Sequence, residues 1–256
     1  MIKTGMCSVT FRDQSVDTII KWTSDVGLDG IEWGADVHAP PGELERVQSI
    51  VRQMKQAGLE VLSYGSYYKA GVTNQPHSFE TILLTAKELG APSIRIWAGE
   101  KGSDEATRQE RQKVTADIHR VADLAENDGI AVHIEYHGGT LTDTSESAKQ
   151  LLEAIAHQNV RLYWQPAVGL EVQDRVEDIK VVKPYLKHVH VFYWNIEERL
   201  PLAEGLHAWK QYLHQLHLED SSEDQHFLLE FVKDNQRDQF QDDAKALLQL
   251  IADYRA

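Results

Sequence analysis

Four polar side chains stand where short apolar runs of the sequence end, and their types are those of a divalent-metal site. Glu135 closes the run AVHIE, and Glu230 follows the run FLL. His190 lies within HVHVFYW, and Gln165 follows the run that ends at Trp164. Burying two carboxylates among apolar residues is costly unless a partner compensates their charge, and a cation between them would do so. The predicted metal ligands are Glu135, Gln165, His190 and Glu230.

This set of donors narrows the choice of ion. Two carboxylates, one imidazole and one amide oxygen suit Mn²⁺, Mg²⁺, Co²⁺ or Zn²⁺, and they leave coordination positions for substrate oxygens. Any one of these residues alone would equally well be a salt-bridged or hydrogen-bonded residue of the core. Four of them at the ends of consecutive apolar runs favour a metal site.

The elements that must position these residues alternate regularly along the chain. A short run rich in Val, Ile and aromatic residues is followed by a longer amphipathic stretch, which indicates a strand and then a helix. The predicted strands are residues 2–9, 30–33, 60–64, 93–97, 131–135, 161–164, 188–193 and 227–232. The predicted helices are residues 14–26, 42–57, 78–89, 104–127, 145–157, 172–185, 206–218 and 239–254. Gly58, Gly90 and Gly129 stand where a helix should end, because glycine adopts the left-handed conformation at little cost.

Strict alternation of strands and helices predicts a parallel sheet with right-handed crossovers. Eight such units fit a single (β/α)8 TIM barrel that spans residues 1–256 as one domain. An open doubly wound sheet is the alternative. A dinucleotide-binding sheet of that kind would need a glycine-rich turn after an early strand, but the sequence contains no G-x-G-x-x-G.

In a barrel of this type, function lies at the carboxyl ends of the strands and in the loops that follow them. Aromatic side chains there would line a sugar pocket, because their faces pack on sugar C–H groups, although aromatic residues at strand ends also serve as core. Arg95, inside SIRIW, would either pair with Glu32 or Glu60 or hold a carboxylate or phosphate of a substrate. The predicted substrate-binding residues are His38, Tyr64, Arg95, Trp97, His137 and Trp194.

The order and spacing of the segments HIEYH, YWQP, HVHVFYW and LLEFV resemble the xylose isomerase-like TIM-barrel superfamily, and most of all its sugar-phosphate isomerase/epimerase branch. The resemblance covers nearly the whole chain. It implies a metal ion held by Glu, Asp, His and Glu from strands five to eight. By this resemblance, Glu135, His190 and Glu230 match the first Glu, the His and the last Glu.

The resemblance also implies the chemistry, which is proton transfer next to a carbonyl through a metal-stabilised enediolate. One glutamate would take the proton and the other would return it, so the predicted catalytic residues are Glu135 and Glu230. The alternative is that both only hold the metal and that a water molecule transfers the proton. The expected activity is that of a divalent-metal-dependent isomerase or epimerase of a small sugar, keto-polyol or sugar phosphate.

Two positions depart from the pattern of the family. Gln165 stands in place of the Asp of strand six, and Val168 stands in place of a His that often follows three residues later. An amide oxygen carries no charge, so weaker metal binding is expected. The two departures keep open a non-catalytic alternative, in which the barrel binds a sugar or has a regulatory role.

The charge balance argues against nucleic acid as a partner. The chain has 40 Asp and Glu against 26 Lys and Arg, which gives a net charge of −14, whereas binding to a phosphate backbone needs a basic surface. This disfavours the abasic-site endonucleases of the same superfamily, whose phosphodiester hydrolysis also needs more His and Asp ligands. We therefore expect a small-molecule substrate.

Other features of the sequence indicate the cellular location and the partners to be expected. The single cysteine, Cys7, cannot form an intrachain disulfide, no apolar run is long enough to span a membrane, and the first residues lack the apolar stretch of a signal peptide. We therefore expect a cytoplasmic protein with no membrane partner. The acidic segment 219–224 is predicted to be a solvated loop. Six tryptophans, several of them near strand ends, are compatible with a homodimer formed through the loop side.

Overall fold

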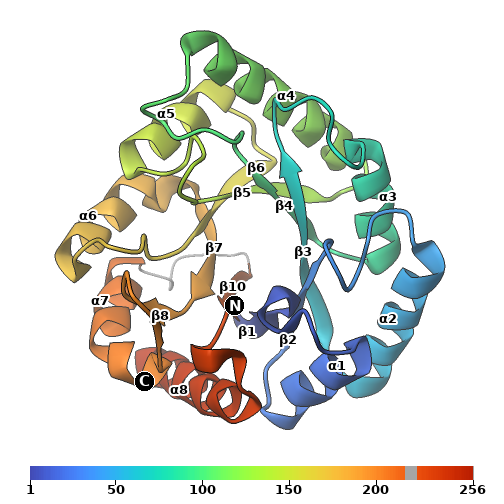
Figure 1. Cartoon of the computed structure of the whole chain (residues 1–256), viewed down its shortest axis with the longest axis vertical. Helices are drawn as coiled ribbons and strands as arrows, with labels where there is room; N and C mark the ends of the chain where they lie inside the picture. Colours follow the sequence, from blue (N-terminus) through green and yellow to red (C-terminus); the bar gives the residue numbers. More distant parts are fainter. Residues whose placement is uncertain (217–223, 256) are drawn as a thin grey trace.

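A closed barrel of eight parallel strands forms the centre of the molecule (Figure 1). The computed structural model describes residues 1–216 and 224–255. The barrel strands are β1 (Ile2–Cys7), β2 (Gly30–Gly34), β3 (Glu60–Lys69), β4 (Ser93–Trp97), β5 (Ala131–Glu135), β6 (Val160–Trp164), β7 (Leu186–Val191) and β10 (Gln225–Leu229). Around the barrel they follow the order β1, β10, β7, β6, β5, β4, β3 and β2, and β1 pairs with both β10 and β2. The predicted (β/α)8 TIM barrel is confirmed, and the open sheet is excluded.

Helices in the connections between the strands surround the barrel (Figure 1). They are α1 (Val16–Asp25), α2 (Leu44–Ala57), α3 (Phe79–Leu89), α4 (Arg108–Glu126), α5 (Ser145–Ile155), α6 (Val172–Val182), α7 (Leu206–Leu216) and α8 (Arg237–Arg255). Gly58 and Gly90 end α2 and α3 with φ angles of 69° and 71°, as the sequence predicts. Within the described residues, no helix combines the length and the apolar character that crossing a membrane requires.

Two hydrophobic clusters follow from the alternation of side chains along each strand. The larger cluster lies between strands and helices and contains the buried rings of Trp33, Trp164 and Trp209. The smaller cluster contains Cys7, Val9, Leu62, Tyr163 and Leu228. A strand residue that packs against the helices cannot also reach the barrel interior, and this decides which strand-end residues meet in the site.

Three buried histidines lie on the amino-terminal side of that site, on β5, β7 and β10. The ring of His188 stacks on that of His226 with centroids 4.0 Å apart, and it lies 4.7 Å from the ring of His133. Burial lowers the pKa of His133 to about 3 and that of His226 to about 4. Both rings are therefore neutral near pH 7, so they fill space here without needing a counter-ion.

The structure differs from the sequence prediction mainly near the site. β1 ends at Cys7 and is followed by a 3-10 helix, η1 (Ser8–Phe11), while β3 continues five residues beyond its predicted end. A short antiparallel pair, β8 (Tyr193–Trp194) and β9 (Arg199–Leu200), follows β7. Strands of two residues carry no detectable periodicity, so the pattern could not predict them. The predicted end of the seventh helix at residue 218 and most of the acidic segment 219–224 lie outside the described residues.

One buried acid of the helical layer makes the fold sensitive to pH. Asp243 of α8 is 3% exposed, and its Oδ1 accepts the backbone N–H of Leu202 (2.8 Å) and the amide of Gln239 (2.8 Å). Burial raises the pKa of Asp243 to about 6, although both hydrogen bonds act in the opposite direction. The ionised form is therefore disfavoured in the folded protein relative to the unfolded chain.

We predict that Asp243→Asn removes part of the pH dependence of stability. Because the folded pKa is raised, the stability contributed by protonated Asp243 is complete below about pH 4 and is lost as the pH rises through about 6. The variant keeps an oxygen that can accept both hydrogen bonds, so it should be about 1–2 kcal/mol more stable than the parent at pH 7 and equal to it at pH 4. Urea unfolding from pH 4 to 7 measures the difference.

Asp253→Asn is the matched control, because this acid of α8 is exposed and pairs with Lys210 on the surface. It should leave the pH profile of the parent unchanged. Parallel profiles for Asp243→Asn and its parent would contradict the prediction.

Candidate active site

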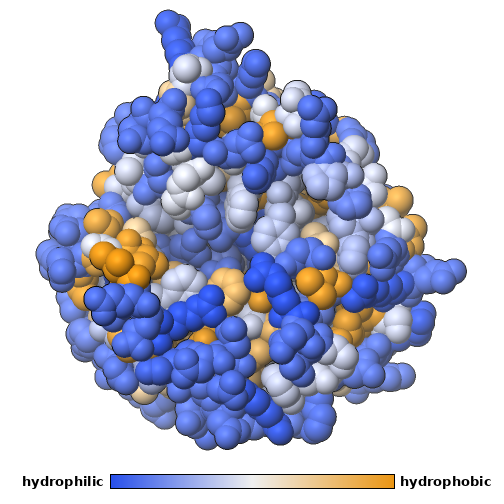
Figure 2. All heavy atoms as spheres, viewed as in Figure 1, coloured by the Kyte–Doolittle hydropathy of each residue, from blue (hydrophilic) through white to orange (hydrophobic). Residues whose placement is uncertain are grey.

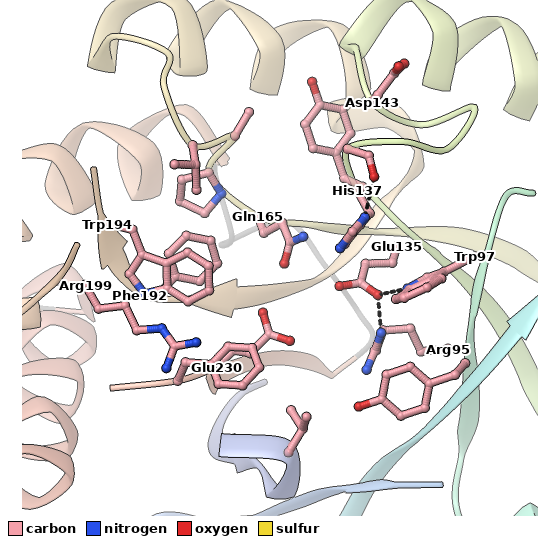
Figure 3. A pocket seen from close by; sticks show the side chains of 18 of the residues that line it. Arg95, Trp97, Glu135, His137, Asp143, Gln165, Phe192, Trp194, Arg199 and Glu230 are labelled. Carbon is pink, nitrogen blue, oxygen red and sulfur yellow. Dashed lines mark hydrogen bonds and ion pairs between the residues drawn. The ribbon is translucent and has the colours of Figure 1, made fainter. Parts of the chain in front are cut away.

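A cavity of about 590 Å³ opens at the carboxyl ends of the barrel strands. Figure 2 shows a hollow at the centre of this face of the molecule, and Figure 3 shows the side chains that line the cavity. Charged and polar residues among them are Arg12, Arg95, Glu135, His137, Asp143, Gln165, Arg199 and Glu230, and aromatic ones are Tyr67, Trp97, Tyr136, Phe192, Trp194 and Phe231. The volume suits a small ring-shaped or short-chain ligand.

Glu135, His190 and Glu230 meet beside this cavity. Their ligand atoms all lie within 4.8 Å of one another. Nδ1 of His190 is 3.7 Å from Oε1 of Glu135 and 3.4 Å from Oε2 of Glu230. The same Nδ1 lies 3.0 Å from Oε1 of Gln165. Three of the predicted metal ligands, Glu135, Gln165 and Glu230, therefore surround Nδ1 of the fourth, His190.

The other ring nitrogen of His190 faces a different carboxylate. Nε2 is buried, lies 3.7 Å from Oε1 of Glu32 and has no hydrogen-bond partner in the described part of the chain. Both ring nitrogens face oxygen acceptors, since Nδ1 donates to the amide oxygen of Gln165 and Nε2 faces Glu32. The surrounding carboxylates raise the pKa of His190, although burial acts in the opposite direction, and a cation bound at Nδ1 would replace the proton there. Glu32 thus orients His190 for binding through Nδ1.

Arg95 joins two of the buried carboxylates. Its Nε donates to Oε1 of Glu32 (2.9 Å), and its Nη1 donates to Oε2 of Glu135. A second donor, the indole N–H of Trp97, reaches the same oxygen of Glu135. A Cβ atom on Gly65 would lie 2.7 Å from Nη2 of Arg95 and 3.0 Å from Oε1 of Glu32, so a glycine is required where β3 passes this ion pair.

Glu135 and Glu230 have different environments although both are buried. Burial by itself would raise the pKa of Glu135, but the Arg95 guanidinium, the rings of His190 and His137 and the hydrogen bond from Trp97 together outweigh it, so the pKa is lowered. Burial raises the pKa of Glu230, and repulsion from Glu135 adds to it. In the described part of the chain, the carboxylate of Glu230 accepts no hydrogen bond. Glu135 is held in its ionised form, whereas Glu230 is available to take up a proton.

The donor set fits a divalent cation. Three buried carboxylates face one guanidinium, so the site has an excess of two negative charges when His190 is neutral. Oε1 of Glu135, Nδ1 of His190, Glu230 and Oε1 of Gln165 are the donors that would hold the ion. A charge of +2 at this point would compensate the excess.

Two other groups of metal-ligating types fit less well. Cys7 lies near Glu32 and His190, but burial raises the pKa of its thiol, and metals bind the thiolate. On the outer surface, His157 donates from Nε2 to Asp123 (3.1 Å) while its Nδ1 accepts the backbone N–H of Asn159 (3.1 Å). A ring in that tautomer has no lone pair left for an ion.

Aromatic side chains line the cavity, and the backbone of two of these residues is strained. Tyr67 and Phe231 have φ angles of 56° and 53°, a region that bulky residues rarely adopt. The backbone N–H of Phe231 donates to Oγ1 of Thr10 (2.9 Å), which holds this conformation. Trp97 stacks on His137 with centroids 4.9 Å apart. The walls offer flat surfaces on two sides of the carboxylates.

The predicted substrate-binding residues divide into two groups. Arg95, Trp97, His137 and Trp194 line the cavity. His38 and Tyr64 do not: His38 uses both ring nitrogens on Ser8 Oγ and Gln14 O, and Tyr64 donates to Ala39 O.

The position of Tyr64 follows from the period of two along a strand. Gly65 on β3 faces the interior beside Arg95, so the neighbouring Tyr64 faces the helices, where its ring is fully buried. The sequence did not single out Tyr67, Phe231 or Arg12 as site residues. Only the position of Phe231, directly after Glu230, was a usable signal. Tyr67 lies beyond the predicted end of its strand.

The comparison with known proteins agrees with the fold. Residues 20–250 match the family model described as xylose isomerase-like TIM barrel. A 3-dehydroshikimate dehydratase from Bacillus anthracis is 27% identical over 225 residues, which are 82% of this chain and 76% of that protein.

Two solved structures cover nearly the whole chain. The probable 3-DHS dehydratase from Bacillus anthracis has a TM-score of 0.77 and 24% identity, and the alignment covers 97% of this chain and 99% of that one. The 3-keto-D-glucoside 4-epimerase from E. coli has a TM-score of 0.73 and 17% identity, with the same coverage of 97% and 99%. The fold is thus shared with a dehydratase and with an epimerase.

We predict that Arg95→Met destabilises the protein strongly. The variant leaves the carboxylates of Glu32 and Glu135 buried without their cation, which should cost about 3–5 kcal/mol in the free energy of unfolding. Urea unfolding measures the loss. Arg46→Met, which removes an exposed pair with Glu43 at 3.4 Å, should cost less than about 1 kcal/mol. A loss for Arg95→Met no larger than that of the control would contradict the role assigned to Arg95.

We also predict that Gln165→Asp strengthens the binding of Mn²⁺. The added carboxylate beside His190 increases the attraction for a cation, and it also increases repulsion in the metal-free site, so the metal-free variant should be less stable. Calorimetric titration with Mn²⁺ and thermal unfolding in EDTA measure the two effects. Gln211→Glu, which adds one negative charge on the exposed face of α7, is the control and should change neither quantity. Equal or weaker Mn²⁺ affinity of Gln165→Asp would show that position 165 does not face the ion.

Proposed function

Because the chain belongs to the xylose isomerase-like TIM-barrel family, we propose that it is a sugar-modifying enzyme that removes the proton from the carbon next to the carbonyl of a small polyhydroxy ketone. The observation that carries this proposal is the meeting of Glu135 and Glu230 at His190 beside a closed-in cavity. The names of the relatives, a dehydratase and an epimerase, support it, because both reactions can begin with this proton transfer.

Glu135, Gln165, His190 and Glu230 would hold the divalent ion of such an enzyme. When bound, the ion supplies Lewis-acid polarisation of the substrate carbonyl. The residues around it keep the donors in place: Arg95 and Trp97 fix the carboxylate of Glu135, and Glu32 fixes the ring of His190. This arrangement is assembled before substrate arrives, so little reorganisation is needed.

Glu230 is the group that we assign as the base. Its carboxylate lines the cavity and accepts no hydrogen bond from the described residues, so an oxygen of Glu230 stays accessible to the substrate. Glu135 is poorly suited to the same task, because a proton on Oε2 would replace hydrogen bonds from Arg95 and Trp97. The two glutamates therefore have unequal roles: Glu135 is a fixed ligand, and Glu230 moves the proton.

A site in which only Glu230 transfers a proton is better suited to dehydration, which needs one base, than to epimerisation, which needs a proton donor on the opposite face of the inverted carbon. In a dehydration, the base takes the proton, its electron pair forms the C=C bond, and the hydroxyl on the next carbon leaves. When both of its ring nitrogens carry protons, His137 could give the Nε2 proton to that hydroxyl, while its Nδ1 donates to Gly138 O (2.6 Å). Figure 3 shows the ring of His137 directed into the cavity. We therefore place dehydration of a β-hydroxy ketone first.

Epimerisation is the second candidate. Glu135 and Glu230 both approach Nδ1 of His190, at 3.7 Å and 3.4 Å. Inversion would use one carboxylate on each face of the substrate, as the sequence analysis expected. It requires that Glu135 either release Arg95 or Trp97 from Oε2 or free Oε1, the oxygen that would hold the ion, in each turnover.

Deuterium exchange tests the proposal. Mn²⁺-loaded protein is incubated in D₂O with 3-dehydroshikimate or with a neutral ketose, and NMR follows the carbon next to the carbonyl. Dehydration gives a conjugated product that absorbs in the ultraviolet, whereas epimerisation gives a saturated product with deuterium at the inverted carbon. Glu230→Gln should lower the rate of either reaction by about 100- to 10,000-fold.

The control for this experiment is Glu60→Gln, since Glu60 begins β3 at the opposite end of the barrel and pairs with Lys3. It should keep the rate of the parent. Binding of these compounds without exchange or product would refute the enzymatic proposal and favour the non-catalytic sugar-binding alternative.

A further inference from the structure

Three arginines line the cavity, and two of them already have acidic partners. Arg95 pairs with Glu32 and Glu135, and Arg12 pairs through Nε with Asp36. For Arg199, no carboxylate lies within 4.0 Å in the part of the chain that the structure describes. Among the described residues, Arg199 is therefore the one arginine of the cavity that forms no ion pair.

The hydrogen bonds of Arg199 leave one edge of its guanidinium free. Nη1 donates to Oδ1 of Asn235 (2.8 Å). Nε and Nη2, which together form the side-on edge, donate to no atom of the described residues. Figure 3 shows the group reaching into the cavity on the side of Glu230. Burial lowers the pKa of Arg199 although attraction from Glu230 acts in the opposite direction, and an arginine remains charged at neutral pH.

The surroundings hold the guanidinium in this position. It lies over the ring of Phe231, 4.3 Å from the centroid, and 5.1 Å from the ring centroid of Trp194. Trp194 is the residue opposite Arg199 in the β8–β9 pair. The turn of that pair is fixed by Asn195, whose Oδ1 accepts the backbone N–H groups of Glu197 and Glu198 at 2.8 Å.

The strained backbone of Phe231 completes this platform. Its φ of 53° aims the ring beneath Arg199, directly after the carboxylate of Glu230. Strain of this kind persists only where the surrounding contacts impose it, and it concentrates at sites that bind ligands. A stacked guanidinium with one free edge is suited to a planar anion that offers two oxygens.

We propose that Arg199 binds a carboxylate of the substrate, so that the substrate is a hydroxylated keto acid rather than a neutral ketose. The proposal rests on the proposed function for the reacting end of the molecule, and it adds the group that is recognised at the other end. A planar carboxylate matches the free edge of Arg199 with two parallel hydrogen bonds. A phosphate monoester would bring more charge and more oxygens than this single edge can bind.

The test compares two ligands that differ in charge at one group. 3-Hydroxybenzoate and 3-hydroxybenzamide share a ring and a hydroxyl, and neither undergoes the reaction. Calorimetric titration in EDTA measures binding without a metal ion that could attract the carboxylate. The parent protein should bind the benzoate at least about 10-fold more tightly than the benzamide, as expected for a charge-assisted hydrogen-bonded pair.

Variants then assign this preference to Arg199. Arg199→Gln should weaken benzoate binding about 10- to 100-fold and leave benzamide binding within about 3-fold. Arg199→Lys should keep part of the preference, because the charge remains without the planar fork. Lys233→Gln removes a nearby surface charge that pairs with Glu198 and should leave the preference unchanged.

The outcomes separate the two proposals. A parent protein that binds both ligands equally, or an Arg199→Gln variant that keeps the preference, would overturn the role of Arg199. Stronger competition by inorganic phosphate than by benzoate at equal concentration would overturn the choice of a carboxylate. A preference that depends on Arg199 without any deuterium exchange on keto acids or ketoses would uphold the anion site and refute the proposed function.

Discussion

A guanidinium buried at the mouth of a parallel barrel is stable only with carboxylates around it, and the site of this protein is organised by that constraint. Arg95 is 2% exposed and is bound by Glu32 and Glu135. The carboxylate of Glu135 is thereby fixed beside His190, and Glu32 is fixed where it faces the other nitrogen of that ring. Gly65 provides the space that the ion pair occupies. The two ion pairs of Arg95 on β4, with Glu32 on β2 and Glu135 on β5, thus determine the orientation of Glu135 and of His190 on β7.

Two glutamates of the same type acquire different chemistry from their neighbours. Oε2 of Glu135 accepts hydrogen bonds from Arg95 and Trp97, whereas the carboxylate of Glu230 faces the cavity beside His190 without a donor among the described residues. Since environments that separate the pKa values of paired acids are a common basis for acid–base assignment, the difference itself points to function. The same part of the fold places Phe231 next to Glu230, so the proposed base and the ring beneath Arg199 are consecutive residues.

The sequence was sufficient for the barrel and for the residues that converge on His190. Strand ends in a parallel barrel all face the same opening, so Glu135, Gln165, His190 and Glu230 could be grouped without coordinates. Tyr64 was misplaced because the end of a strand does not tell which face a residue occupies. Arg199 could not be assigned, since its place depends on a two-residue strand and on the left-handed backbone of Phe231, neither of which leaves a pattern in the sequence.

The β8–β9 pair carries Arg199 outside the barrel proper, hydrogen-bonded to itself and not to the eight barrel strands. Mutations in this hairpin can therefore accumulate without disturbing the buried ions that the barrel needs in order to fold. The buried carboxylates of the barrel and the proposed anion-binding residue of the hairpin can in this sense change independently in evolution. Such a division would let substitutions in the hairpin alter the proposed anion site while the proposed proton-transfer residues are kept. The relatives named as a dehydratase and an epimerase share this barrel at 17–27% identity to this chain.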